Sequence, residues 1–333
     1  MGISTKMKGG TLIAHRPVMA HLVQSHTLAF ELALIKRSAG KKAWQQQLNC
    51  PNYGVSIFAS STGNREIIGN ACAINAFIDL KILGNTKFYL SARLAGGIGY
   101  VSKPFNQENN PKNVAIGSYL NGFIQFGTHV NYAFKKQLFS FGIDMSHFSN
   151  GSAKLPNLGL NLPYLSLGYT RFQSEYAKEY HEKNVIFSKK WSWSALGFLA
   201  PKQVFPTGGR TSPVYGISFL TQKRFTPLSG IEFGIDFVSN QSHFDIYKEI
   251  EKTQLKVLQI GLYSSYLFYL TQTLNLYTGI GAYVKNSLDP AGYIYNRLGI
   301  RYCGKNRLLL NIGIKANFAK ADYFEYGIGY RFK

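Results

Sequence analysis

His147 and Ser149 are a pair of residues whose types and spacing could perform covalent chemistry. A serine hydroxyl is a weak nucleophile until a base removes its proton, and an imidazole has suitable basicity at neutral pH. On an extended strand, residues two apart lie on the same face, so both side chains would project to one side. The chemistry would be acyl transfer, such as ester hydrolysis. A His-x-Ser spacing is common, so the surrounding residues must decide whether it has this role.

A serine hydrolase also needs a group that orients the histidine and donors that stabilise an oxyanion. Asn161 shares the parity of the apolar face of the strand that follows, so we expect it on the same side as His147. Amides of Asn150 and Asn157, or backbone N–H groups near Gly151, could stabilise the oxyanion.

The segment before this pair alternates with period two, which is typical of a β-strand. Its odd positions are Phe139, Phe141, Ile143, Met145, His147 and Ser149, whereas its even positions are mostly small or polar. Residues 165–170 and 231–237 alternate in the same way. Each of these strands has one apolar face and one face of Gly, Ser, Asp and Glu. This pattern favours a barrel whose outer face contacts lipid and whose lumen is wet.

Composition agrees with a chain of many strands. Aromatic residues make up 15% of the 333 residues, Gly occurs 33 times, and only 16% of residues are charged. The sequence contains no run of about 18 uncharged apolar residues, so it predicts no transmembrane helix. We therefore predict an all-β fold: a transmembrane antiparallel β-barrel of about 14–16 strands. A single barrel would span residues 1–333, with the active-site strands and loop in residues 137–172.

The predicted connections alternate in length. Short turns lie near residues 84–86, 135–136, 226–228, 271–273 and 304–307, and longer links lie near 101–114, 150–160, 202–213 and 239–254. Short periplasmic turns and long extracellular loops are typical of outer-membrane barrels. The link at 173–190 is long where this parity expects a short turn. A short helix is possible within 240–254.

The net charge of +21 could indicate a nucleic-acid partner, but no dense basic block or aromatic-basic motif supports one. Basic residues gather at turns instead, which suits a rim facing anionic lipid. The spacing of the three cysteines, Cys50, Cys72 and Cys303, matches no metal-binding motif. The same is true of the irregularly spaced histidines His15, His21 and His26. We therefore expect no metal and no cofactor. Residues 1–10 lack the apolar core of a signal peptide, which counts against export.

The run from His147 to Asn161 resembles the signature of lipid A 3-O-deacylases of the PagL type. The matching pattern is His147-x-Ser149-Asn150-Gly-x-x-Lys-x-Pro-Asn157-x-Gly-x-Asn161. The resemblance implies a bacterial outer-membrane esterase with a lipid-facing Ser-His-Glu triad, Ser149 as nucleophile and His147 as base. It also implies that Asn150 and Asn157 support the site. The family's Glu falls on Asn161, a departure that leaves Glu175 and Glu182 in the long link as alternative acids, whereas the lumen-side parity of Asp144 counts against it.

The last residues, from Glu325 to Lys333, resemble the C-terminal signal of outer-membrane barrels. The implied partners are lipopolysaccharide (lipid A) as substrate and the lipids of the outer membrane, and a homodimer is left open. Two other functions compete: a non-catalytic porin-like or structural barrel, favoured by Asn161, and a soluble lipid-binding β-protein, favoured by the missing signal peptide.

Overall fold

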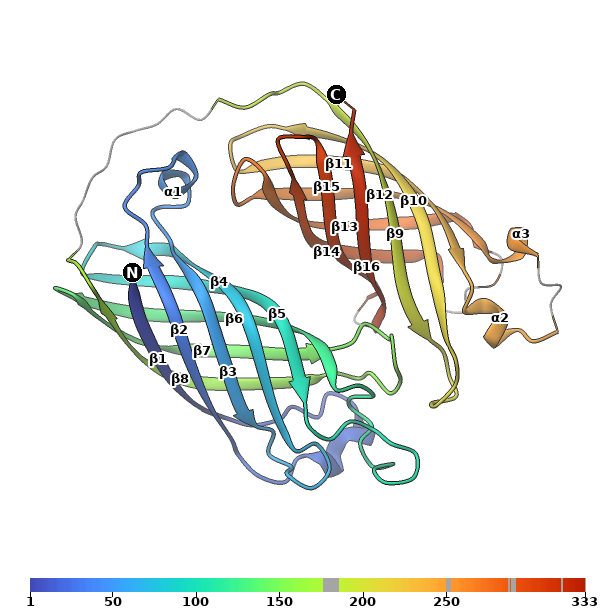
Figure 1. Cartoon of the computed structure of the whole chain (residues 1–333), viewed down its shortest axis with the longest axis horizontal. Coiled ribbons are helices and arrows are strands. Elements are labelled where there is room, and N and C mark those ends of the chain that lie inside the picture. The colour runs from blue at the N-terminus through green and yellow to red at the C-terminus, as the bar shows by residue number, and fades with distance from the viewer. Residues whose placement is uncertain (176–185, 250–252, 287, 289–291, 319, 333) are drawn as a thin grey trace. The chain divides into compact units, whose positions relative to one another are not determined.

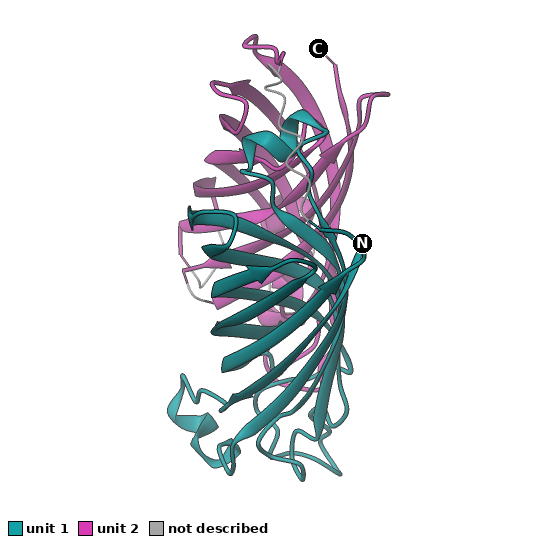
Figure 2. Ribbon diagram, turned by 90° about the vertical axis from the view of Figure 1, so that its left-hand side faces the viewer, with its two compact units in different colours: residues 1–150, 156–184 teal, residues 151–155, 185–333 magenta. Residues whose placement is uncertain are grey.

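A computed structural model describes the chain except for residues 176–185, 250–252, 287, 289–291, 319 and 333. The chain divides into two compact units (Figure 2). Unit 1 comprises Met1–Asn150 and Pro156–Asn184, and unit 2 comprises Gly151–Leu155 and Val185–Lys333. Each unit contains a closed antiparallel β-barrel of eight strands.

The first barrel closes because its first and last strands pair (Figure 1). Its strands are β1 (Gly2–Gly10), β2 (Thr27–Arg37), β3 (Asn52–Ser61), β4 (Asn70–Gly84), β5 (Phe88–Val101), β6 (Leu120–Phe134), β7 (Gln137–Ser149) and β8 (Leu160–Phe172). A 3-10 helix η1 (Pro17–Leu22) and a short helix α1 (Ala43–Gln47) lie in the connections on either side of β2.

The second barrel closes through β16 and β9. Its strands are β9 (Ser192–Gln203), β10 (Thr211–Arg224), β11 (Ser229–Asn240), β12 (Leu258–Tyr269), β13 (Leu274–Lys285), β14 (Ile294–Cys303), β15 (Leu308–Asn317) and β16 (Lys320–Arg331). Helices α2 (His243–Ile246) and α3 (Gln254–Val257) lie between β11 and β12, where a short helix was predicted. None of the helices in the described part of the chain has the length and apolar character to cross a membrane.

The predictions of an all-β barrel fold and of about 14–16 strands are confirmed, but the prediction of one barrel over 1–333 is wrong. The strands form two rings of eight because β1 pairs with β8 and β9 pairs with β16. Alternation shows which face of a strand is apolar and does not show which strand it pairs with. The link at 173–190, unexpectedly long for a turn, is the connection between the two barrels.

The outer surface of the first barrel is apolar and its interior is filled. On β7, Phe141 and Ile143 point outward and are 54% and 61% exposed, whereas Asp144 is buried inside. Lys8 Nζ lies 2.7 Å from Glu31 and 3.3 Å from Asp144 in the interior. Eight strands enclose a space that side chains just fill, so the lumen, predicted to be wet, is filled by side chains that include these paired charges.

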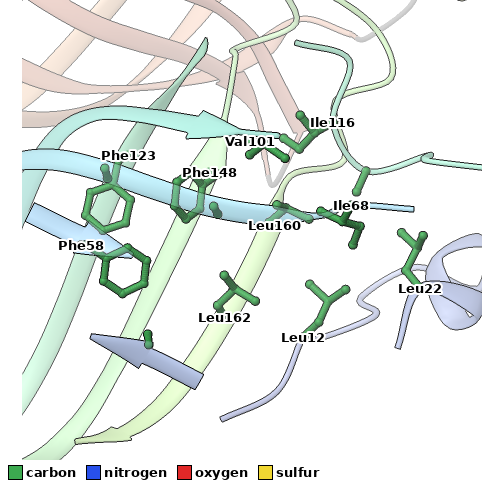
Figure 3. Packing of buried hydrophobic residues seen from close by; sticks show 14 of the residues in the cluster. Leu12, Leu22, Phe58, Ile68, Val101, Ile116, Phe123, Phe148, Leu160 and Leu162 are labelled. Atoms are coloured by element: carbon green, nitrogen blue, oxygen red, sulfur yellow. The ribbon is translucent and has the colours of Figure 1, made fainter. Parts of the chain in front are cut away.

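An apolar cluster fills the end of the first barrel that carries the predicted site (Figure 3). Phe148 is fully buried there, and its ring lies 5.0 Å from that of Phe123, centroid to centroid. Leu160, at the start of β8, belongs to the same cluster. Because neighbouring residues on a strand point to opposite sides, the inward anchor at Phe148 directs His147 and Ser149 outward.

Candidate active site

The histidine of the predicted pair contacts Asn161 directly. His147 on β7 is the cross-strand partner of Asn161 on β8. The Nδ1 atom of His147 lies 2.7 Å from Oδ1 of Asn161, a hydrogen-bond distance. Since a carbonyl oxygen can only accept, the proton of this bond belongs to Nδ1 of the imidazole. The Nε2 atom of a neutral His147 is then the basic nitrogen, as a general base requires.

Gly159 leaves the space that the His147 ring occupies. Its φ of +84° is in the left-handed region that favours glycine. A Cβ atom at this position would lie 2.7 Å from Cε1 of His147 and 3.2 Å from the carbonyl oxygen of Phe148. The glycine therefore serves two needs, a backbone turn before β8 and close approach to the imidazole.

Ser149 is held by Asn157 across the loop between β7 and β8. Its hydroxyl lies 3.0 Å from Nδ2 of Asn157, which can donate to it, and 3.2 Å from Oδ1, which can accept from it. The same Oδ1 accepts the backbone N–H of Asn150 at 2.9 Å. Ser149 is only 5% exposed. Asn157 thus places an amide donor at the hydroxyl that would attack a substrate.

Asn150 connects this loop to the connection between β5 and β6. Its side-chain Nδ2 donates to Oγ of Ser118 at 2.7 Å. Next to that contact, Gly159 N donates to the carbonyl oxygen of Ala115 at 2.9 Å, and Ile116 forms a β-bridge with Asn157. Sequence reasoning missed this second loop, because its residues are ordinary in type and its contacts are distant in sequence.

Gly151, predicted to support the oxyanion, has a backbone reason to be glycine. Its φ is +61°, and a Cβ atom would lie 2.3 Å from the Phe324 ring. Gly151 belongs to unit 2, whereas Ser149, Asn150 and Asn157 belong to unit 1.

The alternative acids lie away from the imidazole or beyond the described structure. Asp144 faces the barrel interior, with Oδ1 lying 3.2 Å from Nε2 of His129. Glu175 follows the end of β8 opposite to the end that carries Asn161. Glu182 lies outside the described residues. The group beside His147, where the resemblance implies a glutamate, is therefore the amide of Asn161.

His15 is the neighbour of this site that sequence reasoning did not anticipate. Beyond β1 the chain continues along β8, with Thr11 N donating to the carbonyl oxygen of Pro163 at 3.3 Å and Ile13 N to that of Asn161 at 3.0 Å. This places Nδ1 of His15 3.1 Å from Nδ2 of Asn161. The two residues are 146 positions apart, so the contact depends on the pairing that closes the barrel.

Solved structures similar to this chain are outer-membrane proteins. A triple mutant of the Rhodopseudomonas blastica porin is 8% identical, with both chains covered completely and a TM-score of 0.19. Omp33 of Acinetobacter baumannii is 6% identical, covering 100% of this chain and 97% of that chain, with a TM-score of 0.19. The KdgM porin is 7% identical, with both chains covered completely and a TM-score of 0.17. The barrel fold is defined by the strand pairing of the chain itself. A comparison with curated proteins gave no match.

Two family models match the two halves of the chain. The model described as lipid A 3-O-deacylase (PagL) matches residues 30–170, which include β7, β8 and the loop between them. The model described as acyloxyacyl hydrolase, C-terminal domain, matches residues 191–333, which include every strand of the second barrel. With both barrels matched, the chain belongs to the PagL family of outer-membrane proteins.

Proposed function

We propose that this protein is an outer-membrane esterase that removes an acyl chain from lipid A by a Ser149–His147 mechanism. The observation that carries the proposal is the bond from His147 Nδ1 to Asn161 Oδ1, beside a serine held by Asn157. It leaves Nε2 of His147 as the base on the face that Ser149 shares. Family membership supports the substrate class.

In the acylation step, Ser149 Oγ attacks the ester carbonyl carbon while Nε2 of His147 takes the hydroxyl proton. The carbonyl π electrons move to oxygen, and the Nδ2 donor of Asn157, which lies 3.0 Å from Ser149 Oγ, would stabilise that oxyanion. When the tetrahedral intermediate collapses, the bond to the sugar oxygen breaks. His147 returns its proton to that oxygen, so the deacylated lipid leaves as an alcohol.

In the deacylation step, Nε2 of His147 takes a proton from water, whose oxygen attacks the acyl-serine carbonyl. Collapse of the second intermediate breaks the bond to Ser149 Oγ, which recovers the proton from His147. A fatty acid is released and the enzyme is restored. Asn161 keeps the proton of Nδ1 in place throughout, so Nε2 alone exchanges protons.

The position of the site on the barrel suits a lipid substrate. The short turn between β6 and β7, at residues 135–136, lies at the opposite end of β7 from His147 and Ser149. In outer-membrane barrels the short turns are periplasmic, so the site end of β7 reaches the outer leaflet. There lipopolysaccharide can present an ester to residues on the apolar outer face of the strand.

Mass spectrometry of lipid A tests the proposal in cells that express wild type, Ser149→Ala or His147→Ala. We expect the wild type to remove one acyl chain and both variants to leave lipid A intact. Heat-modifiable migration on gels would show that the variants are folded barrels. Deacylation that persists in Ser149→Ala would contradict the proposed nucleophile.

A non-catalytic barrel is the second candidate, and Asn161 is the observation that favours it, because an amide stabilises an imidazolium less than a carboxylate does. In that case lipid A would be the same in cells with wild type, with Ser149→Ala and with no barrel.

A further inference from the structure

The amide of Asn161 lies between two imidazoles. Its Oδ1 faces Nδ1 of His147 at 2.7 Å, and its Nδ2 faces Nδ1 of His15 at 3.1 Å. Because Nδ2 can only donate, His15 accepts this bond through a bare Nδ1. The three residues come from three separate segments, β7, β8 and the connection after β1.

An amide differs from a carboxylate in that its two ends are chemically distinct. If the Asn161 side chain turned over, Nδ2 would face His147 and would need an acceptor there. The His147 proton would then move to Nε2, and the nitrogen toward the serine would no longer be a base. In a serine protease, an asparagine in place of the triad aspartate lowers kcat about 10⁴-fold because the histidine has the wrong tautomer.

We infer that His15 is a positioning residue that fixes the orientation of the Asn161 amide and thereby keeps His147 in its basic tautomer. An acceptor at position 15 holds Nδ2 of Asn161 on its own side, which leaves Oδ1 for His147. A donor at position 15 would attract Oδ1 and turn the amide over. This inference rests on the proposed function, and it accounts for how an amide could serve where the family has a glutamate.

Substitutions of opposite hydrogen-bonding type at position 15 test the inference. His15→Lys supplies only donors, and we expect it to lower the rate of lipid A deacylation at least about tenfold, toward the 10⁴-fold loss of a wrong tautomer. His15→Glu supplies only acceptors, and we expect a rate equal to or above that of wild type. Both rates are measured in outer-membrane vesicles by mass spectrometry of lipid A.

His26 offers a matched control for the charge that these variants introduce. It is exposed on the same connection between β1 and β2. We expect His26→Lys and His26→Glu to change the rate less than about threefold. Equal effects of lysine at positions 15 and 26 would mean that charge near the lipid head groups matters, and would overturn the inference.

The Asn161→Glu background separates amide orientation from a general structural role. A carboxylate offers an acceptor to His147 whichever oxygen faces it, so the donor at position 15 can no longer reverse the contact. We expect the penalty of His15→Lys to shrink at least tenfold in this background, which a double-mutant cycle measures. An undiminished penalty would overturn the inference.

The tautomer of His147 gives a readout that does not depend on activity. In ¹⁵N-histidine-labelled protein carrying Ser149→Ala, we expect His147 to be protonated at Nδ1, and the added His15→Lys change to move that proton to Nε2. An unchanged tautomer would overturn the role of His15. Loss of activity in Ser149→Ala with normal activity in His15→Lys would overturn this inference alone, whereas activity in Ser149→Ala would overturn the proposed function.

Discussion

Asn161 is a neutral amide at the position where the resemblance to the PagL signature implies a glutamate. Its Oδ1 can accept the Nδ1–H of His147, as the 2.7 Å contact shows, but it adds no negative charge. Orientation and charge stabilisation are separate contributions of a triad acid. The contact with Asn161 is therefore suited to orient the imidazole of His147. Stabilisation by a negative charge would require a carboxylate at position 161.

Asn161→Glu should retain or raise deacylation, by about tenfold, because a carboxylate stabilises the imidazolium that forms in the transition state. Tenfold corresponds to about 1.4 kcal/mol of transition-state free energy. Asn161→Leu is the matched control variant, which removes the oxygen that accepts the hydrogen bond of His147. It should lower the rate of deacylation at least about 100-fold. Initial rates on lipid A in vesicles measure both, and an inactive Asn161→Glu variant would show that position 161 is not the place of the acid.

Gly159→Ala should lower deacylation at least about tenfold, because the new Cβ atom would meet the His147 ring and the backbone would be held at an unfavourable positive φ. The strain of such a residue costs roughly 1–3 kcal/mol, so most of the protein should still fold. Gly292→Ala is a control, since Gly292 also has positive φ, +101°, but has nothing within 4 Å of the added Cβ. Equal activity losses in both variants would contradict a specific contact with His147.

At the scale of elements, the site is assembled from the β7–β8 hairpin and two other connections. Phe148, buried in the apolar cluster, fixes which side of β7 faces outward, and the connection between β5 and β6 braces the loop through Ser118. The hairpin could be predicted from alternation and local parity, since both depend on neighbouring residues. The bracing contacts could not, because they depend on three-dimensional packing between distant segments.

Ser118→Ala should lower deacylation a few-fold, because it removes the acceptor of the Asn150 side chain and a neutral hydrogen bond contributes about 1 kcal/mol. Ser102→Ala, at the other end of the same connection, removes a bond to Asn70 N instead and should leave activity unchanged. Rates measured on the two folded variants check this expectation. A larger loss in Ser102→Ala would mean that the whole connection, rather than its contact with Asn150, governs the site.

At the scale of the molecule, each barrel has its own network of buried charges. Arg93 pairs with Glu31 and Asp79 in the first, and Arg297 lies 2.9 Å from Asp236 and 2.6 Å from Glu325 in the second. The sequence indicated about 14–16 strands and their polar faces. It did not indicate the closure into two rings, because strand parity is the same whether strands β8 and β9 are neighbours or not.

Arg297→Met should lower the heat stability of the second barrel and leave Ser149-dependent deacylation nearly unchanged. Removing one partner of a buried ion pair typically costs about 3–5 kcal/mol, because the remaining carboxylates stay buried without their cation. Arg93→Met is the counterpart in the first barrel and should reduce both stability and activity. Heat-modifiable gel migration and lipid A analysis measure the two effects, and equal activity losses would contradict independent networks.

The seam between β1 and β8 has a consequence for biogenesis. His147 and Asn161 can pair as soon as the β7–β8 hairpin forms, but His15 reaches Asn161 only when β1 pairs with β8. A precursor in the periplasm whose first barrel has not yet closed would lack the contact between His15 and Asn161. The proposed hydrolysis of lipids would then be weak before the barrel closes. Full activity would be reached only when the barrel has been inserted into the membrane.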